Sequence, residues 1–535
     1  MLRSILKKIH FWQALNQTIK RQGDNSQELS PSNLSDNIQE NLKHLQTILG
    51  TSSDIVVREF NFGYEGKIEA AIIYLTGMTS SAIVNDSIIK PLMYDTRLFS
   101  SNELLVTNNI ELIQKTMLSV GGVKRVSTIE LLIDGCLYGD TVLLVNGSQE
   151  ALVISTVGWE ARSVEEPKTE GVVRGPREGF TETLGTNTAL LRRKIRNPNF
   201  TFETMQIGQK TKTGVRIAYL KELVNPRLVE EVKRRLKRIN TDAILESGYI
   251  EQYIEDAPFS PFQTVGNCEK PDVVAAKLLE GRVAILVDGT PMVLTIPLFF
   301  IESFQSAEDY YSRPYYASMV RSLRYLAFLI TILAPAAYVA LTNFHQEMIP
   351  TPLLFTMAAA KEGTPFPAVT EALGMGLIFE ILREAGVRLP RPVGSAITIV
   401  GALVIGESAV SAGLIGAPMV IVVGITAISS FVVPPQADAG AILRLLFTIF
   451  AGFLGAFGMM IVLLGILIHL SSLRSFGTPY LSPLAPLSLE GLKDTFIRVP
   501  LWAMFTRPRI FSGHDPQKQE FRLMPEPPSE DSENR

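Results

Sequence analysis

The hydrophobic and polar positions divide the chain into two parts with different patterns. Up to about residue 318, short apolar runs alternate with segments in which apolar residues recur every third or fourth position. Short runs of this kind are typical of buried strands, and the recurring spacing is typical of amphipathic helices. Beyond residue 318, long uncharged runs take over. The pattern predicts an α/β N-terminal region followed by an α-helical, polytopic membrane domain.

Two segments of the α/β region repeat each other 142 residues apart. GDTVLLVNGSQEALVIS (139–155) and GRVAILVDGTPMVLTIP (281–297) each place Asn-Gly or Asp-Gly between two apolar runs. These dipeptides supply the positive φ angles of a tight turn, so each segment is predicted to be a β-hairpin. Upstream, residues 71–92 and 215–236 are similar as a strand followed by a helix. We predict two related α/β subdomains, 36–160 and 201–318, with chance similarity of two hairpins as the alternative.

Four long apolar runs follow, each close to the length that crosses a bilayer core of about 30 Å. They cover residues 323–344, 393–413, 414–433 and 444–470. The predicted membrane domain is 319–475, with four to six crossings. Basic residues flank the first run and the turn before the second, and by the positive-inside rule both lie in the cytoplasm. The side of the membrane on which the chain ends stays open.

A predicted helix between the first two runs carries charges. Residues 368–386 include Glu371, Glu380 and Glu384, and Glu407 lies in the middle of the second run. Facing lipid, each ionised group would cost about 2.5–3.5 kcal/mol. The helix must therefore lie at the interface, pack inside the protein or line water. These four glutamates are candidates for a cation path. An interfacial helix with one protonated or hydrogen-bonded glutamate is the alternative.

The stretch RGPREGFTETLGTNTALLRRKIRNP (174–198) combines arginines with glycines. It could form a phosphate site, a nucleic-acid contact or a structural element. Its glycines lack the spacing of a phosphate loop, and a chain with net charge −3 is a poor candidate for binding nucleic acid. We interpret residues 161–200 as a connector between the subdomains. Its arginines would pair with nearby acids, such as Glu165, Glu166, Glu178 and Glu182.

Enzymatic and metal chemistry have little support in the sequence. Two cysteines and five histidines show no metal-ligand spacing, and no GxxxxGK[ST] loop is present. We therefore expect no enzyme activity, metal or cofactor. The N-terminus lacks the apolar core of a secretory signal, so the α/β region is expected in the cytoplasm. Residues 1–35 and 513–535 are predicted to be disordered polar tails, and 476–512 a basic interfacial segment.

Two long motifs resemble those of one known family. GWEARSVEEPKTEGVVRGPREGFTETLGTNTALLRRKIRNP (158–198) resembles the signature of the A subunits of bacterial spore germinant receptors, the GerA family. REAGVRLPRPVGSAITIVGALVIGESAVSAGL (383–414) resembles its membrane block, and FVVPP and PYLSPLAPL fit later segments. The resemblance covers about residues 50 to 510. Signature residues that match within the connector are Arg174, Gly175, Pro176, Arg177, Glu178, Asn187, Arg192 and Arg193.

The resemblance implies a membrane subunit of a nutrient germinant receptor in the inner membrane of the spore. Its expected partners are a transporter-like B subunit, a lipoprotein C subunit, further copies of itself and membrane lipid, but no nucleic acid. Family A subunits are thought to assemble into an oligomeric, ligand-gated ion channel, in which helix 368–386 would line the pore. A non-conducting scaffold that holds the other subunits is the alternative. Neither the germinant nor the oligomer number follows from the sequence.

Overall fold

The computed structural model describes residues 33–50, 52–63, 66–94, 110–158, 171–388, 404, 406–488, 491–504, 506–507 and 518. Glu165, Glu166 and most of the two predicted tails and of the apolar run 393–413 lie outside these ranges. The chain forms two compact units. Unit 1 contains Met1–Ser163 and Gly185–Glu203, and unit 2 contains Val164–Leu184 and Thr204–Arg535. The predicted connector 161–200 is therefore divided between the units.

Unit 1 is a five-stranded antiparallel sheet with helices on both faces. Its order is β1 (Ile55–Phe62), β2 (Ile68–Leu75), β4 (Thr141–Val145), β5 (Ala151–Ile154) and β3 (Val123–Val126). Side chains of a strand alternate between the faces. Ala71 and Ile73 of β2 accordingly pack with α2 (Ile38–Leu49) and α6 (Ile129–Tyr138), and Ile72 packs with residues 84–92 and 110–113. The sheet therefore has a separate apolar core on each face.

A second sheet has the same strand order, and all of it except residues 200–203, at the start of its first strand, belongs to unit 2. Its strands are β6 (Phe200–Ile207), β7 (Thr213–Leu220), β9 (Val283–Val287), β10 (Val293–Ile296) and β8 (Gly266–Cys268). Leu143 pairs with Leu152 in the first hairpin, and Ile285 pairs with Leu294 in the second, 142 residues further on. Both hairpins form as predicted. The shared strand order and register agree with two related subdomains.

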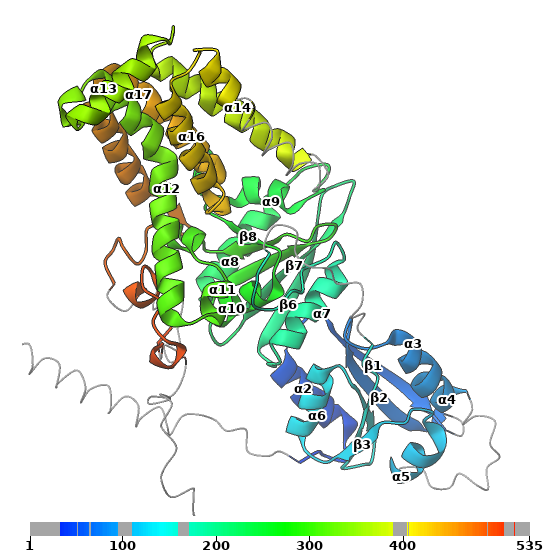
Figure 1. Cartoon of the computed structure of the whole chain (residues 1–535). Helices are drawn as coiled ribbons and strands as arrows, with labels where there is room; N and C mark the ends of the chain where they lie inside the picture. The colour runs from blue at the N-terminus through cyan, green and yellow to red at the C-terminus, as the bar shows by residue number, and fades with distance from the viewer. Residues whose placement is uncertain are drawn as a thin grey trace, which may run out of the picture. The chain divides into compact units, whose positions relative to one another are not determined.

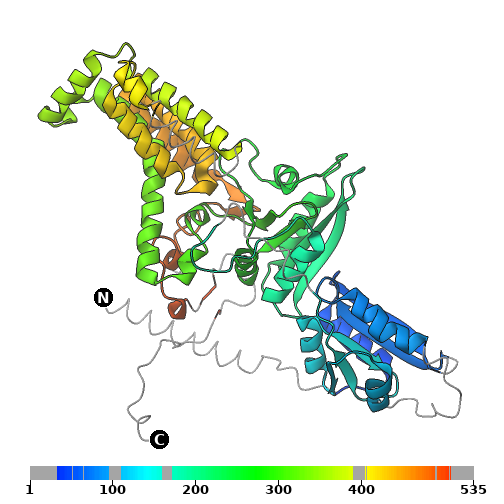
Figure 2. The ribbon, with the colours of Figure 1, turned by 45° about the vertical axis from the view of Figure 1, so that its right-hand side comes forward.

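The first helices of unit 2 pack with its sheet, and the later ones form a separate helical part. α8 (Pro226–Lys237), α9 (Ser247–Ile254) and α10 (Pro271–Leu279) belong to the sheet, and α11 (Glu308–Tyr311) leads out of it. A helical part follows, made of α12 (Pro314–Asn343), α13 (Thr351–Glu362), α14 (Ala368–Arg388), α16 (Ala417–Ser430) and α17 (Ala437–Ser472). α12 packs along both α16 and α17 (Figures 1 and 2).

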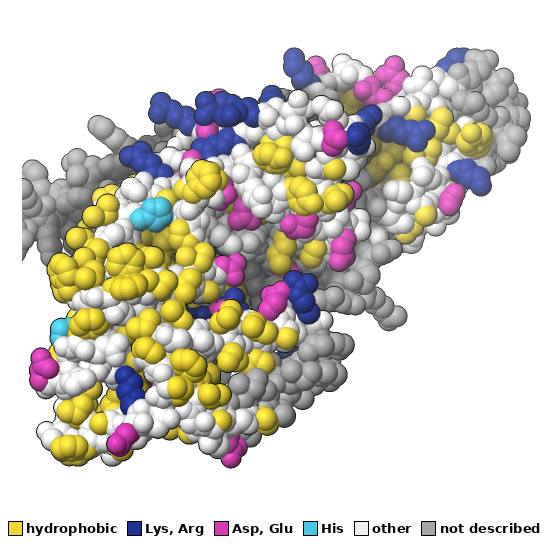
Figure 3. All heavy atoms as spheres, turned by 90° about the horizontal axis from the view of Figure 1, so that it is seen from above, with side chains coloured by type: hydrophobic (Ala, Val, Ile, Leu, Met, Phe, Trp, Pro, Cys, Tyr) yellow, Lys and Arg dark blue, Asp and Glu magenta, His cyan; other side chains and the backbone are white. Residues whose placement is uncertain are grey.

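Two helices of this part are long and apolar enough to cross a membrane. They span Pro314–Asn343 and Pro434–Ser472, and α16, with 14 residues, is apolar but shorter. Only 22% of the apolar window of the second helix is buried inside the chain. Hydrophobic side chains accordingly gather on the surface of the helical part (Figure 3). A core helix of a soluble protein would bury that surface, so this helix is suited to a lipid environment.

α17 is interrupted in its middle at Gly455. This glycine has φ +60°, and a Cβ added to it would lie 2.9 Å from the side chain of Phe344. The following amide, Ala456 N, donates to His345 Nε2 at 3.3 Å. Glycine tolerates the positive φ and the close approach of Phe344. The break is therefore fixed by the segment that follows α12.

The chain after α17 returns to the α/β part of unit 2. Ser475 Oγ donates to Thr264 O at 2.6 Å and accepts from Leu298 N at 3.0 Å. Phe300 N donates to Tyr480 O at 3.0 Å, and the ring of Tyr480 is fully buried. Each contact joins the segment after α17 to a residue at least 177 positions earlier. This segment ties the last long helix to the second sheet.

Candidate functional site

Three of the four candidate glutamates lie on one helix, but not on one face of it. α14 carries Glu371, Glu380 and Glu384 and packs against α12, α16 and α17. Because an α-helix turns about 100° per residue, the nine-residue step from Glu371 to Glu380 places them on opposite sides of α14. Glu407 lies apart, in helical residues 406–411, and is exposed. The three carboxylates of α14 therefore do not converge on one face within one chain.

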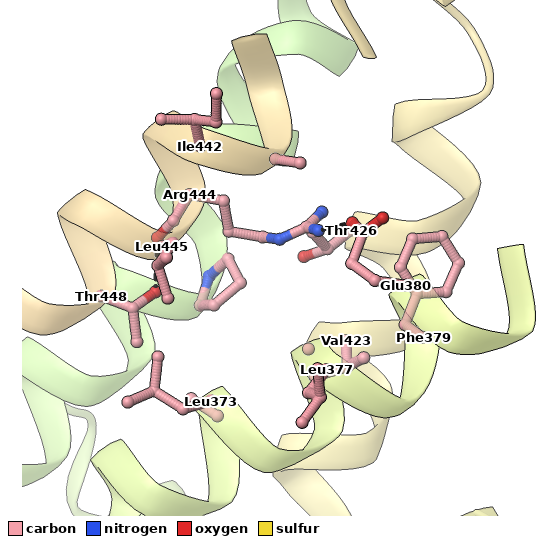
Figure 4. A pocket seen from close by; sticks show the side chains of 14 residues that line it. Leu373, Leu377, Phe379, Glu380, Val423, Thr426, Ile442, Arg444, Leu445 and Thr448 are labelled. Carbon is pink, nitrogen blue, oxygen red and sulfur yellow. Dashed lines mark hydrogen bonds and ion pairs between the residues drawn. The ribbon is translucent and has the colours of Figure 1, made fainter. Parts of the chain in front are cut away.

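Glu380 lies in the wall of a cavity of about 290 Å³ between α12, α14, α16 and α17 (Figure 4). Arg444 of α17 donates Nη2 to Glu380 Oε1, and Arg383 Nη2 lies 2.8 Å from Glu380 Oε2. The Arg444 guanidinium also stacks over the Phe379 ring at 5.7 Å. Most other lining side chains are apolar, among them Leu373, Leu377, Val423, Ile442 and Leu445. The cavity therefore presents a carboxylate bonded to two guanidinium groups to a mainly apolar space.

Glu371 lies inside the helical part with only 2% of its surface exposed. Among the residues that the structure describes, neither of its carboxylate oxygens accepts a hydrogen bond. Lys361 of α13 and Tyr338 of α12 are close enough to interact with its charge. A buried carboxylate without hydrogen bonds is costly in apolar surroundings, so its position calls for a counter-charge such as that of Lys361.

The exposed positions of α14 form a stripe along the helix. The stripe consists of Thr370, Gly374, Leu377, Ile381, Glu384 and Arg388, which recur every three or four residues. Arg388 Nε donates to Glu384 Oε1 at 2.6 Å, and both side chains are largely exposed. Of the three acids of α14, Glu384 alone belongs to this stripe. A surface that combines small, apolar and polar side chains in this way can face either lipid or a water-filled path between subunits.

The first half of the signature connector packs against unit 2. Arg174 and Arg177 are exposed, whereas Pro176 and Glu178 are half-buried. Gly175 has φ +138°, and a Cβ added there would lie 2.7 Å from the ring of Tyr311. Tyr311 in turn donates its hydroxyl to Asp272 Oδ2, and burial together with this bond raises its pKa. The glycine thus lets the backbone lie on an aromatic ring just before α12.

The connector is then held by backbone and turn contacts. Phe180 N donates to Glu269 O at 2.8 Å, and Gly289 N donates to Glu182 O at 2.8 Å. Leu184 N donates to Asp288 Oδ1 at 3.0 Å, in the turn of the second hairpin. Residues 180–184 therefore follow one edge of the second subdomain. These bonds satisfy backbone groups, as a structural connector requires.

The second half of the connector forms α7 (Leu184–Lys194), which from Gly185 onward belongs to unit 1. Asn187 is buried and Arg193 is half-buried on this helix. Arg192 is buried too, and its partner is Asp54 rather than one of the glutamates named from the sequence. Burial raises the pKa of Asp54, but the charge and hydrogen bonds of Arg192, with a bond from Ser52, outweigh it and lower that pKa overall.

A cluster of charged side chains at the start of α12 was not identified from the sequence. Arg321 Nε lies 3.2 Å from Asp309 Oδ2, and its Nη1 lies 2.9 Å from Asp494 Oδ1. Arg324 Nη1 shares Asp309 at 2.8 Å, and Tyr310 donates its hydroxyl to Asp494 at 2.6 Å. Arg321 is completely buried. From the sequence alone, Arg321 and Arg324 indicate only the topology of the first apolar run. Their partners, Asp309 before α12 and Asp494 after α17, become visible only in the fold.

Metal-ligand groups and thiols were the two kinds of reactive group to look for among the described residues. No group of three or more His, Cys, Asp or Glu that could hold a metal ion occurs among them. Cys136 and Cys268 are both buried and are not joined in a disulfide. Burial raises the pKa of the Cys136 thiol to about 12, so this side chain stays protonated near neutral pH and is a poor nucleophile.

Comparisons with known proteins agree with the resemblance drawn from the motifs. The family model described as Bacillus/Clostridium GerA spore germination protein matches residues 43–510. Spore germination protein KA of Bacillus subtilis (strain 168) is 46% identical over 499 residues, which are 93% of this chain and 91% of that protein. Spore germination protein GerLA of Bacillus cereus is 38% identical over 484 residues, 90% and 97% of the two chains.

A solved structure also matches the chain. It is the crystal structure of the N-terminal domain of the A subunit of the Bacillus megaterium spore germinant receptor GerK3. The match has 38% identity and a TM-score of 0.41, and it covers 51% of this chain and 98% of that one.

Proposed function

This chain belongs to the Bacillus/Clostridium GerA spore germination protein family, and from this premise we propose that it is the A subunit of a nutrient germinant receptor. In this proposal it is a multi-pass protein of the spore inner membrane with its α/β subdomains in the cytoplasm. Several copies assemble into a ligand-gated ion channel. A transporter-like B subunit and a lipoprotein C subunit complete the receptor, and the germinant acts on that complex.

The observation that carries the channel proposal is the composition of α14 within an apolar helical part. α12 and α17 have the length and hydropathy of membrane spans, yet α14 beside them carries three acids. The exposed stripe of α14, from Thr370 to Arg388, is the surface that further copies could bring together around a water-filled path. Within one chain Glu371 is buried and Glu380 is paired, so Glu384 is the acid best placed to face such a path.

The charged cluster at the start of α12 supplies a route from the α/β part to the helices. Asp309 comes directly from the second subdomain, Arg321 is on α12, and Asp494 belongs to the segment after α17. A rearrangement of the second subdomain would move Asp309 and so change its ion pair with Arg321. We propose that germinant binding in the complex shifts this cluster, and that α12 and α17 transmit the shift to α14.

A scaffold remains the second candidate, and one observation favours it. Glu380 is paired with Arg444 and Arg383 inside the chain, as expected for a charge that fixes helix packing. A scaffold would hold the B and C subunits without conducting ions.

Cation flux separates the two candidates. The receptor with its A, B and C subunits is reconstituted into sealed vesicles loaded with K⁺, and K⁺ release is followed on addition of a nutrient mixture. A channel predicts release that changes in rate when Glu384 is replaced by Gln or Lys, with Glu130→Gln on α6 as a control. Assembled receptors that bind their subunits normally but release no K⁺ would support the scaffold.

A further inference from the structure

We propose that the outer face of α9 and the loop that follows it form a membrane-interface anchor, which inserts aromatic side chains into the headgroup region of the bilayer. This inference rests on the proposed function in one respect, since it takes α17 to be a membrane span. It adds a lipid-binding surface to the second α/β subdomain.

The face is apolar and points outward from the second subdomain. Leu245 lies just before α9, and Tyr249 and Tyr253, four residues apart, lie on one side of the helix. They are 63%, 46% and 57% exposed, and Phe259 in the following loop is completely exposed. Ile250 and Ile254, on the other side of α9, are buried in the core. α9 therefore has two apolar sides, and the sheet accounts for one of them.

Direct contacts join this face to the C-terminal end of α17. Ser260 Oγ lies 2.9 Å from His469 Nε2, and the ring of Phe262 lies 6.2 Å from the His469 ring. Asp256 accepts a hydrogen bond from Phe476 N just beyond the helix. The loop that carries Phe259 thus contacts the last turn of α17 on one side and the segment after α17 on the other. Its distance from the membrane is set by that helix.

The same end of α17 carries apolar side chains on its surface. Leu467 is 50% exposed and Ile468 is 63% exposed, and polar Ser471 and Ser472 end the helix. If α17 spans the bilayer, the change from Ile468 to Ser471 marks the hydrocarbon boundary. Ser260 contacts His469, which follows Ile468 on α17. Phe259 directly precedes Ser260 and therefore lies at that boundary. The apolar surface continues from α17 onto the α9 face.

The chemistry of the face fits the headgroup region better than the hydrocarbon. Tyrosine has an apolar ring and a polar hydroxyl, and aromatic residues are enriched where lipid tails meet headgroups. A soluble partner protein would not require the face to be level with the end of a membrane helix. Lipid is the occupant that the continuity with α17 favours.

Depth-dependent fluorescence quenching tests the proposal on the full chain in vesicles. Trp12, Trp159 and Trp502 are first replaced by Phe, and a single tryptophan is then introduced as Phe259→Trp, Ile468→Trp or Val173→Trp. Val173 serves as the water-facing control because it is highly exposed in the connector. It lies two residues before Gly175, which packs on the ring of Tyr311. Lipids brominated at shallow or deep positions along the acyl chain act as quenchers.

The proposal expects quenching of Phe259→Trp that is greatest with the shallow bromines, quenching at Ile468→Trp as well, and none at Val173→Trp. Quenching at Ile468→Trp together with none at Phe259→Trp would overturn the anchor and leave the membrane span intact. That result, combined with blue-shifted emission at Phe259→Trp, would assign the face to a second protein copy instead. Absence of quenching at Ile468→Trp would overturn both the span and the anchor.

Discussion

Arg192 and Asp54 form a two-point ion pair in the interior of unit 1. Arg192 Nε donates to Asp54 Oδ2 at 2.7 Å, and its Nη2 donates to Oδ1 at 3.0 Å. The two side chains are 1% and 0% exposed. The guanidinium also lies 5.1 and 5.2 Å from the ring centroids of Phe200 and Phe202. One arginine of the signature thus joins α7 to the strand edge at residue 54 and to β6.

Removing this arginine should loosen unit 1. Arg192→Met leaves Asp54 buried without its counter-charge, which typically costs about 3–5 kcal/mol. Hydrogen–deuterium exchange of the β1 and β2 amides should speed up accordingly, while the amides of β7 and β9 keep their rates. Arg192→Lys retains the charge but loses the two-point geometry, so its β1 and β2 exchange rates should lie between those of the unchanged chain and of Arg192→Met. Unchanged exchange in Arg192→Met would show that the pair does not stabilise the unit.

Gly175 should be sensitive even to the smallest side chain. In Gly175→Ala the methyl group would meet the Tyr311 ring, and the positive φ adds strain, so the connector should detach at a cost of about 1–3 kcal/mol. Limited proteolysis of the purified chain should then cut near residue 175 faster. Gly171→Ala is the matched control, because a Cβ there meets nothing within 4 Å. Equal cleavage of the two variants would argue against a packed connector.

The pH dependence of unit 2 should include a contribution from Glu251. Burial, and then the charges of Glu255 and Glu246, raise the pKa of Glu251 to about 7. Because the pKa of Glu251 is higher in the folded than in the unfolded chain, its stabilising contribution is fully present below the unfolded-state pKa near 4.3. This contribution of about 3 kcal/mol is lost as the pH rises through the folded-state pKa of about 7.

Glu251→Gln is neutral at every pH, so it should raise the thermal unfolding midpoint at pH 8, and the gain should shrink towards pH 5. Glu230→Gln, at an exposed position of α8, is the comparison. A gain from Glu251→Gln that is the same at both pH values would contradict a raised pKa.

The ion pair in the cavity should behave differently from the exposed pair on the same helix. Glu380→Gln leaves the buried guanidinium of Arg444 without its carboxylate and should destabilise the detergent-solubilised chain by about 3–5 kcal/mol. Combining it with Arg444→Met should recover much of that loss, measured as a thermal double-mutant cycle. Glu384→Gln breaks an exposed pair and should cost no more than about 1 kcal/mol. Similar losses for both single variants would refute the distinction.

The α/β fold was largely predictable because its signals are local. Asn-Gly and Asp-Gly turns between apolar runs indicate hairpins wherever they occur, and the 142-residue repeat indicates that the strand order is used twice. The partners of charged residues were not predictable, since Asp54 is 138 positions from Arg192 and Asp494 is 173 from Arg321. A sequence shows that an arginine is present but not which distant acid it meets.

The acids of α14 illustrate the same limit within one helix. Their presence near apolar runs was visible, and so was the cost of exposing them to lipid. Which side of α14 faces its neighbours depends on packing with α12, α16 and α17. That packing buries Glu371, pairs Glu380 and leaves Glu384 on the surface. Helical spacing alone separates Glu371 from Glu380, and it could have been used to predict that they do not share a face.

The most direct test of the channel is a cysteine scan along α14 in the assembled receptor. Single cysteines at 368–386, in a background that lacks Cys136 and Cys268, are exposed to a membrane-impermeant thiol reagent. A channel predicts reaction at helical period along the stripe, at Thr370, Gly374, Leu377, Ile381 and Glu384, with Ala372 and Met375 protected. Uniform protection along α14 would contradict the channel and favour the scaffold.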